Sequence, residues 1–284
     1  MAHQLPKDLG NQVAAALAED LGSGDVTARL VPEDQQVRGR VITRDDAVLC
    51  GQAWVNETFR RLDSTLDIEW HANDGDRIRA EQILFGISGR ARPVLTGERT
   101  ALNFLQLLSG TATQTRRYVE AVSGTQCTII DTRKTLPGLR TAQKYAVLCG
   151  GAQNHRIGLF DMVLIKENHI AAAGSISRAI TAAKGTAGGV KIEVEVENLS
   201  GLEEALAAEP DIILLDNFSN AEMKEAVDFT RSRSRTVRLE ASGNVTLEGI
   251  RAIAQTGVDY ISVGALTKHV RAVDLSMRLE FAGR

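Results

Sequence analysis

The chain has 284 residues, 43% of them hydrophobic, which suffices for one large domain or two modest domains with a substantial core. A formal net charge of −3 excludes the strong positive field that would draw the protein to nucleic acid or to an acidic membrane. No run approaches the ~18 apolar residues of a membrane span, and the start of the chain has no signal-peptide pattern. Cys50, Cys127 and Cys149 match no metal-binding or redox spacing, so we expect buried free thiols in a cytoplasmic, soluble protein.

Residues 1–110 predict an α+β domain. Residues 11–22 have the pattern of an amphipathic helix ending at Gly22, and residues 51–62 predict a second helix with Trp54 on its apolar face. The predicted strands cover residues 36–45, 66–72 and 81–89. A long helical passage over residues 94–122 then crosses a domain boundary near Gly110.

From residue 127 onward, short β-rich runs alternate with helical runs. The predicted strands are residues 127–131, 160–166, 190–197, 211–216, 237–242 and 259–264. Right-handed crossovers between them give either a doubly wound sheet or a barrel. We favour the barrel because no glycine-rich nucleotide fingerprint follows the first strand. Six units fall short of eight, so residues 111–267 predict an incomplete, six-stranded, open α/β barrel. Residues 268–284 are expected to form a last helix that returns to the first domain.

Every predicted strand of the barrel ends in polar residues or glycine. The carboxyl ends of parallel strands form the functional face of such folds, so these side chains are expected to converge there. A single cation at the end of a strand is usually a solvated surface charge. Here all six strand ends carry polar residues or glycine, which favours a shared functional site. The residues at these ends are Thr132, Arg133 and Lys134; Lys166 and Asn168; Glu195; Asp216 and Asn217; Ser242, Gly243 and Asn244; and Val263, Gly264 and Ala265.

The strand over residues 190–197 alternates branched apolar residues with glutamates. A buried parallel strand should be apolar on both faces, so the glutamate face is unusual. If the branched residues face the helices, Glu193 and Glu195 point into the barrel, where a carboxylate needs a cation or a metal ion. Lys166, His155 and Arg156 are the candidate cations.

The mixture of arginine, lysine and histidine suits a substrate with several negative groups. Arginine grips carboxylates in a bidentate manner, whereas lysine acts as a point charge. Around Gly264 a strand is followed by a glycine and then by the start of a helix. This order is typical of a phosphate-binding site at the last strand of a barrel.

Several sequence runs together resemble quinolinate phosphoribosyltransferase, the carboxylating nicotinate-nucleotide pyrophosphorylase of NAD biosynthesis. The resemblance extends almost from end to end, from EDLGSGDVTA to SVGALTKHV. The runs that carry it are GERTALNFLQLLSGTAT, DTRKTLPGLR, KYAVLCGGAQNHRIGLFDMVLIKENHI, IEVEVEN, DIILLDNF and LEASGNV.

The resemblance implies a pentosyltransferase that joins quinolinate to 5-phosphoribosyl 1-diphosphate with Mg²⁺ and releases diphosphate and carbon dioxide. It implies an N-terminal α/β sandwich followed by an open-sided α/β barrel, which agrees with the two-part prediction above. It also implies a homodimer in which Arg99 of one chain completes the neighbouring site.

The roles that the resemblance implies fall into three groups. Arg133, His155 and Arg156 would bind the quinolinate carboxylates, with Thr132 beside them, and Lys134 and Lys166 would meet phosphate groups and a carboxylate. Glu195 and Asp216 would hold the ribosyl diphosphate through its hydroxyls and Mg²⁺, and with Lys134 and Lys166 they are the candidate catalytic residues. The residues expected to cradle the 5-phosphate are Ser242, Gly243, Asn244, Val263, Gly264 and Ala265.

Three other interpretations remain open at this point. Lys166 could be the Schiff-base amine of an aldolase, although the surplus of cations beside it suits anion binding better. A non-decarboxylating relative would use nicotinate in place of quinolinate. A non-catalytic sensor of a phosphorylated metabolite would have little reason to keep two carboxylates among cations.

Overall fold

The computed structural model describes residues 3–282. The chain divides into two compact units that interleave along the sequence, whereas the sequence predicts a single boundary near Gly110. Unit 1 contains the chain up to Arg116, Thr135–Gly151 and the chain from Leu266 onward. Unit 2 contains Arg117–Lys134 and Ala152–Ala265.

Unit 1 is built on a four-stranded antiparallel sheet with the strand order β12-β1-β5-β3. Its helices are α1 (Leu9–Leu21), the 3₁₀-helix η1 (Ala28–Leu30), α2 (Gln52–Leu62), most of α3 (Ala91–Ala121) and α4 (Arg140–Cys149). Its strands are β1 (Gln36–Thr43), β2 (Ala47–Val48), β3 (Asp67–Trp70), β4 (Arg77–Ile78), β5 (Ile83–Arg90) and β12 (Leu275–Phe281). A short helix, α10 (Ala265–Lys268), leads from unit 2 into this unit.

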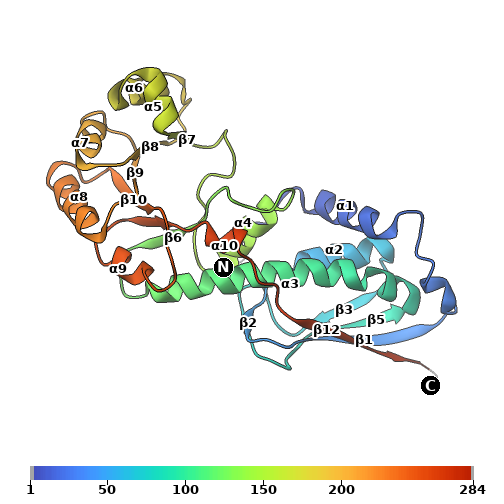
Figure 1. Cartoon of the computed structure of the whole chain (residues 1–284). Helices are drawn as coiled ribbons and strands as arrows, with labels where there is room; N and C mark the ends of the chain where they lie inside the picture. The colour runs from blue at the N-terminus through green and yellow to red at the C-terminus, as the bar shows by residue number, and fades with distance from the viewer. Residues whose placement is uncertain (1–2, 283–284) are drawn as a thin grey trace. The chain divides into compact units, whose positions relative to one another are not determined.

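The core of unit 1 lies between this sheet and the helices α2 and α3. Figure 1 shows α1, α2 and α3 on the same side of the sheet. Val41 and Phe85 from the sheet, Phe59 from α2, and Leu102 and Leu105 from α3 are almost fully buried in one apolar cluster. The predicted helices over residues 11–22 and 51–62 therefore form, and they bury the apolar faces that the sequence shows.

The prediction of a C-terminal helix over residues 268–284 is wrong, because Leu275–Phe281 form strand β12; residues 283–284 lie outside the described residues. This strand pairs antiparallel with β1, from Val37 opposite Phe281 to Thr43 opposite Leu275. The physical reason is that the apolar side chains of this segment recur at every second residue, as in a strand. The residues Leu275, Met277, Leu279 and Phe281 all pack against the core of unit 1.

Unit 2 is built on a six-stranded sheet with the order β6-β11-β10-β9-β8-β7, in which all neighbours are parallel. The strands are β6 (Thr128–Ile130), β7 (Val163–Ile165), β8 (Ile192–Val196), β9 (Ile212–Asp216), β10 (Arg238–Ser242) and β11 (Tyr260–Ser262). Each predicted strand of the second domain contains one of them. Because β6 and β7 are edges that do not pair with each other, the fold is the expected six-stranded, open α/β arrangement.

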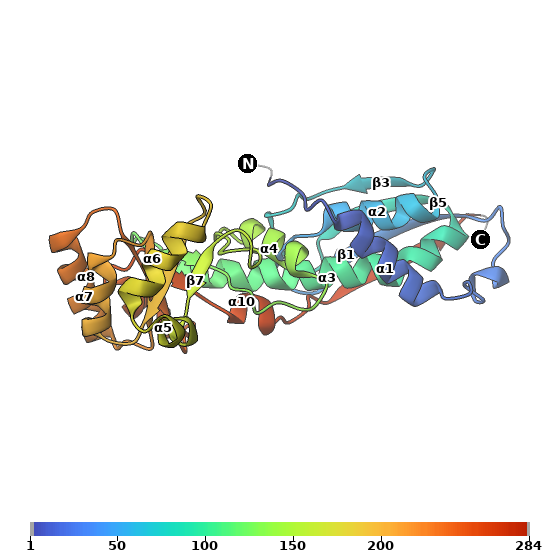
Figure 2. The same cartoon turned by 90° about the horizontal axis from the view of Figure 1, so that it is seen from above.

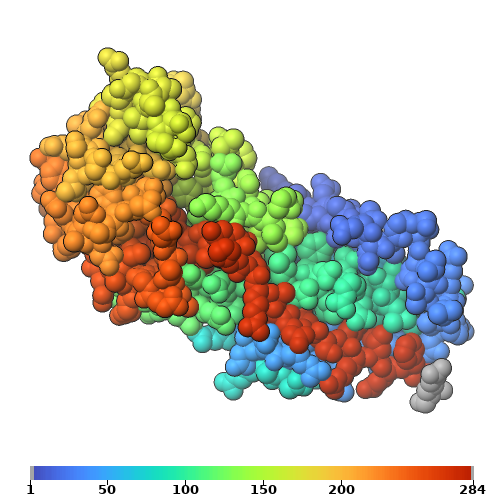
Figure 3. Space-filling view, viewed as in Figure 1, coloured from blue at the N-terminus to red at the C-terminus, as the bar shows by residue number. Residues whose placement is uncertain are grey.

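The helices of unit 2 are α5 (Glu167–Ala173), α6 (Ile176–Thr186), α7 (Leu199–Ala207), α8 (Asn220–Arg233) and α9 (Ile250–Ala254). Figure 2 shows α6, α7 and α8 side by side, and the gold and orange residues of α7 and α8 form an outer face in Figure 3. Local sequence signals fix where these helices begin. Ser219 and Glu222 form a reciprocal capping box at the start of α8, and Asn198 caps α7 by accepting from the Gly201 amide at 2.9 Å.

Among the described residues, no helix combines the length and the hydropathy needed to cross a membrane. The longest, α3, carries charged and polar side chains along its 31 residues.

Candidate functional site

The polar strand ends of unit 2 lie along one edge of the parallel sheet. Thr132, Arg133 and Lys134 directly follow β6, and Lys166 caps the start of α5 directly after β7. Asp216 and Ser242 are the last residues of β9 and β10, and these two strands pair in register there. Glu195 lies inside β8 opposite Leu214 of β9. Parallel pairing therefore brings together side chains that are far apart in the sequence.

Lys166, Glu195 and Asp216 form a mixed-charge group at this edge. The Lys166 ammonium lies 3.3 Å from Oε2 of Glu195, whose side chain is only 12% exposed. Burial raises the pKa of Glu195, the positive charge of Lys166 lowers it, and the negative charge of Asp216 raises it further. Two carboxylates and an ammonium are thus close enough to interact directly.

Arg133 and Arg156 are also neighbours. Burial lowers the pKa of Arg156, and repulsion from Arg133 lowers it further, while Glu193 and Asp161 oppose these effects. The Nε of Arg133 is buried and has no hydrogen-bond partner among the described residues. A buried guanidinium nitrogen without an acceptor is costly, so this position suits an anionic ligand.

The loop that carries His155 is anchored by Asp131, directly after β6. The Asp131 carboxylate accepts from the His155 backbone amide at 2.8 Å and from the Asn154 side chain at 2.8 Å. Asp131 is fully buried, so these contacts fix the backbone from which the His155 side chain projects.

His155 lies against two buried glutamates inside the sheet. Its Nε2 is 2.7 Å from Oε2 of Glu193 and 3.6 Å from Oε2 of Glu240. Burial raises the pKa of Glu193 to about 7, while a hydrogen bond from Glu240 lowers it. Burial, followed by repulsion from Glu193, raises the pKa of Glu240 well above its ordinary value. Glu240 is therefore the carboxyl that keeps its proton, and Glu193 is the partner that faces the imidazole.

Glycine-bearing turns complete the edge. The Ser242 backbone carbonyl accepts from the Asn217 backbone amide at 3.1 Å, and the Asn217 side-chain oxygen accepts from the Asn244 side chain at 3.4 Å. Gly243 has a φ of +101°, and a Cβ there would lie 2.2 Å from Oδ1 of Asn217. Only glycine fits such a position.

Gly264 brings the last strand end against the first. A Cβ on Gly264 would lie 3.1 Å from Cδ of Lys134 and 3.6 Å from Oγ1 of Thr132. Val263, which donates its amide to the Ile130 carbonyl at 2.9 Å, joins the ends of β6 and β11. Lys134 is thus placed beside a glycine whose backbone a ligand can approach closely.

The predicted site residues divide into two sets. Unit 2 carries every one of them except Arg99, with Ala265 at the start of α10. Arg99 is an exposed residue of α3 in unit 1.

Sequence reasoning missed Glu240 and Asp131, whereas Asn217 was among the expected strand-end residues. Glu240 could have been found, because it is a charge between the apolar residues Leu239 and Ala241 of β10, as Glu193 is a charge between apolar residues of β8. Asp131 acts through the backbone of a neighbouring loop, and no sequence pattern predicts such a contact.

Chemically, the edge can bind a ligand with several negative groups and stabilise separated charge. The guanidiniums of Arg133 and Arg156 suit carboxylates, and the lysines suit phosphates. Glu195 and Asp216 lie near enough for the charge of Asp216 to raise the pKa of Glu195, and both offer carboxylate oxygens, the donor type that a hard divalent cation prefers.

Comparison with known families identifies both halves of the chain. Residues 25–109 match the family described as quinolinate phosphoribosyl transferase, N-terminal domain. Residues 111–278 match the family described as quinolinate phosphoribosyl transferase, C-terminal domain.

Individual relatives agree with these matches. The chain is 44% identical over 274 residues to a nicotinate-nucleotide pyrophosphorylase (carboxylating) of Mycobacterium leprae, covering 94% of this chain and 95% of the relative. It is 42% identical over 260 residues to a probable enzyme of the same name from Bacillus subtilis, covering 91% and 89%. The solved structure of the nicotinate-nucleotide pyrophosphorylase of Francisella tularensis aligns with a TM-score of 0.93 at 48% identity, covering 98% of each chain.

Proposed function

Because the chain belongs to the quinolinate phosphoribosyltransferase family, we propose that it joins quinolinate to 5-phosphoribosyl 1-diphosphate. The products are nicotinate mononucleotide, diphosphate and carbon dioxide, and the reaction belongs to NAD biosynthesis, as for the relatives of that name. The observation that carries the proposal is the gathering of Arg133, His155, Arg156 and Lys166 with two carboxylates at one edge of the sheet in unit 2.

Quinolinate binding is assigned to the cationic side of this edge. The pyridine dicarboxylate carries two negative charges, which match two guanidiniums that repel each other when no anion lies between them. The unpartnered Nε of Arg133 is the donor that most needs such an anion. His155 adds a third contact, and its side chain is held by Glu193 at 2.7 Å.

The ribosyl diphosphate is assigned to the remaining strand ends. Ser242, Gly243, Asn244, Val263, Gly264 and Ala265 offer backbone groups and short side chains for the 5-phosphate. Lys134 beside Gly264 supplies a positive charge there. Thr132 belongs to the same corner, since its hydroxyl accepts from the Lys134 amide at 3.1 Å.

Loss of diphosphate leaves positive charge on the ribose and negative charge on the leaving group. Glu195 and Asp216 can stabilise the first, and Lys166 and Lys134 can stabilise the second. The pyridine nitrogen is already a nucleophile, so the main task of these residues is to align the two substrates. We assign Lys134, Lys166, Glu195 and Asp216 to catalysis on this basis.

Magnesium is part of the proposal. Burial, and to a lesser extent repulsion from Asp216, raises the pKa of Glu195, and these two carboxylates fit a hard divalent cation with oxygen ligands, held partly through substrate and water. When bound, Mg²⁺ would neutralise charge on the diphosphate.

Decarboxylation follows ring alkylation, because a positively charged ring nitrogen accepts the electrons left at the adjacent carbon. In this step the chain's own residues hold the ring and the carboxylate that stays. The two-carboxylate substrate also separates this proposal from the nicotinate-using alternative. An ammonium held 3.3 Å from a carboxylate suits charge stabilisation better than the Schiff-base chemistry of the aldolase alternative.

We further propose a homodimer in which Arg99 completes the neighbouring chain's site. We also propose a cytoplasmic location, with which the three free cysteines are consistent. Arg99 is exposed on α3 and is therefore available to a second chain. Mixed Arg99→Ala and Arg156→Ala chains should regain activity, since a hybrid dimer would contain one intact site. Inactive mixtures in which subunit exchange is demonstrated would refute the shared site, and cell fractionation would check the location.

The activity itself is tested by carbon dioxide release from quinolinate labelled in the carboxylate that leaves. Release should require both 5-phosphoribosyl 1-diphosphate and Mg²⁺, and nicotinate should not replace quinolinate as acceptor. Turnover of nicotinate with no release from quinolinate would overturn the proposal.

A further inference from the structure

A second group of reactive side chains lies in unit 1, apart from the residues assigned above. Cys50 lies just before α2, Asp74 in the turn between β3 and β4, and Cys149 at the end of α4. One ligand atom from each of the three residues, a thiol sulfur or a carboxylate oxygen, lies within 4.8 Å of the other two. Their spacing in the sequence, 24 and 75 residues, matches no metal-binding motif, so folding alone brings them together.

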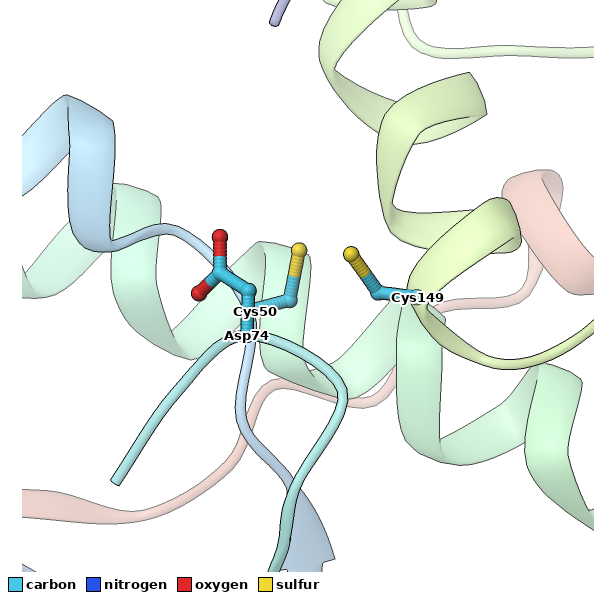
Figure 4. A group of neighbouring side chains, drawn as sticks. All are labelled: Cys50, Asp74 and Cys149. Atoms are coloured by element: carbon cyan, nitrogen blue, oxygen red, sulfur yellow. The ribbon is translucent and has the colours of Figure 1, made fainter. Parts of the chain in front are cut away.

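The two sulfur atoms face each other, with the Asp74 carboxylate on the side of Cys50 (Figure 4). Cys50 is fully buried and Cys149 is 4% exposed, and both belong to an apolar cluster that includes Trp54 and Leu108. Asp74 is half-buried, so the group reaches solvent on its carboxylate side.

The main chain of both cysteines is held by side chains of α3. The Ser109 hydroxyl accepts from the Cys50 amide at 3.0 Å and donates to the Cys50 carbonyl at 3.2 Å. The guanidinium of Arg116 donates to the Cys149 carbonyl at 3.3 Å and to the Gly150 carbonyl at 2.9 Å. The thiols are therefore presented from fixed backbone positions.

The Asp74 carboxylate is oriented in the same way. One oxygen accepts from the Gly51 and Gln52 amides at 2.9 and 3.2 Å, and the other accepts from the Tyr145 hydroxyl at 2.9 Å. A carboxylate oxygen has two lone pairs, so the oxygen bonded to Tyr145 can also bind a metal ion. Ligands that are held by surrounding hydrogen bonds are typical of protein metal sites.

The electrostatics of the group call for a cation. Burial raises the pKa of Asp74, hydrogen bonds from Gln52, Tyr145 and Gly51 oppose this, and Asp76 adds repulsion. Burial also raises the pKa of the Cys50 thiol well above its usual range, and Cys149 and Asp74 reinforce that shift. The largest charge effects on these two pKa values come from Asp76, Asp74 and Cys149, which are all acidic groups. A desolvated carboxylate beside two thiols is stabilised when a metal ion joins it.

We propose that Cys50, Asp74 and Cys149 bind a divalent metal ion of the zinc class, with water or the Tyr145 hydroxyl in the fourth position. Two sulfurs and one oxygen suit zinc, which accepts thiolate and carboxylate ligands in a tetrahedral arrangement. On binding, each thiol releases its proton to the solvent and its sulfur forms the bond to the metal. The ion ties the end of α4 to the segments before α2 and after β3, which makes the site structural.

A disulfide between Cys50 and Cys149 is the competing outcome. It would leave Asp74 without a role, and the negative charge of Asp74 disfavours the thiolate that oxidation requires. A bound cation removes both objections. Asp74 then has a role as a ligand, and its negative charge attracts the cation. The observations therefore favour the metal ion.

Cobalt(II) is the probe that tests the site. Full-length protein, reduced and stripped with a chelator, is titrated with Co²⁺, and Zn²⁺ is then added. We expect a thiolate-to-cobalt charge-transfer band with the visible bands of a tetrahedral ion, saturating at one ion per chain and lost when Zn²⁺ displaces cobalt. Binding at Glu195 and Asp216 gives no thiolate band, so the two sites are read separately.

Variants assign the ligands. Cys50→Ser and Cys149→Ser should each weaken the metal affinity by at least about tenfold, and Asp74→Asn should weaken it as well. Cys127→Ser is the matched control, because Cys127 belongs to unit 2 and should leave the band unchanged. Circular dichroism checks that each variant is folded.

A second measurement needs no variant. Mass spectrometry after alkylation under mild denaturation should find Cys50 and Cys149 protected by Zn²⁺, and Cys127 modified with or without it. Absence of a thiolate band in the wild-type protein, or its survival in both serine variants, would overturn the proposal. So would a Cys50–Cys149 disulfide forming under a mild thiol oxidant in protein that binds no cobalt.

Discussion

The buried carboxyl of Glu193 should make the stability of the protein fall between mildly acidic and mildly alkaline pH. Glu193 is fully buried, and its pKa is raised to about 7 from the ordinary value of 4.5. A carboxyl that binds its proton more tightly in the folded state stabilises the fold fully below its unfolded pKa. That contribution is lost as the pH rises through the folded pKa, so the window runs from 4.5 to about 7.

The size of the effect follows from the pKa difference. Each pKa unit corresponds to about 1.4 kcal/mol, so the free energy of unfolding should decrease by about 3 kcal/mol across this window on account of Glu193 alone. Replacing Glu193 by glutamine removes the titrating group and keeps its shape. The Glu193→Gln protein should therefore lose about 3 kcal/mol of the pH dependence of the wild-type protein.

Urea unfolding followed by circular dichroism at pH 5 and at pH 8 measures this difference. Glu225→Gln is the matched control, because Glu225 is an exposed carboxylate on α8 and its replacement should leave the pH dependence unchanged. An identical pH dependence in wild-type and Glu193→Gln proteins would refute the reasoning about the buried carboxyl.

Two further predictions concern the strand ends. Gly243→Ala should destabilise the protein by about 1–3 kcal/mol and weaken the binding of 5-phosphoribosyl 1-diphosphate, since a Cβ would meet Asn217 at a φ of +101°. Calorimetry and thermal unfolding measure both effects, and Gly185→Ala in α6, with no atom within 4 Å, should cost nothing. Lys166→Ala should lower kcat by about 100-fold or more, and the acidic limb of its pH profile should move to higher pH, because Lys166 lowers the pKa of Glu195. An unchanged kcat would contradict the catalytic assignment of Lys166.

The alternation of strands and helices after residue 127 was predictable from the sequence because each strand is a short apolar run bounded by polar residues. The pleat of β8 was predictable because branched apolar residues alternate with glutamates there, and Glu193 is fully buried as expected. The strand β12 was not predicted, because a seven-residue alternation at the end of the chain gains its stability from pairing with β1, 232 residues earlier between Thr43 and Leu275.

The features of the candidate site that could not be predicted from the sequence are contacts between segments that are far apart along the chain. Lys166 was a candidate partner for Glu195 from the sequence, but the order β8-β7 at the edge of the sheet, which places the two side chains together, is not encoded in a local pattern. The contact of His155 with Glu240 likewise requires the fold, since the two residues come from a loop and from a strand at the centre of the sheet. Cys50 and Cys149 were expected to be buried free thiols, and their proximity to each other comes from folding alone.

The central claim is that cations at separate strand ends bind the dianionic pyridine while other strand ends bind the sugar phosphate. Calorimetric titration of the Arg133→Ala protein with each substrate separately tests it most directly. We predict that the affinity for quinolinate falls at least about tenfold, because a charge-assisted hydrogen bond is lost, while the affinity for 5-phosphoribosyl 1-diphosphate stays close to that of the wild-type protein. Equal losses for both substrates would contradict the account.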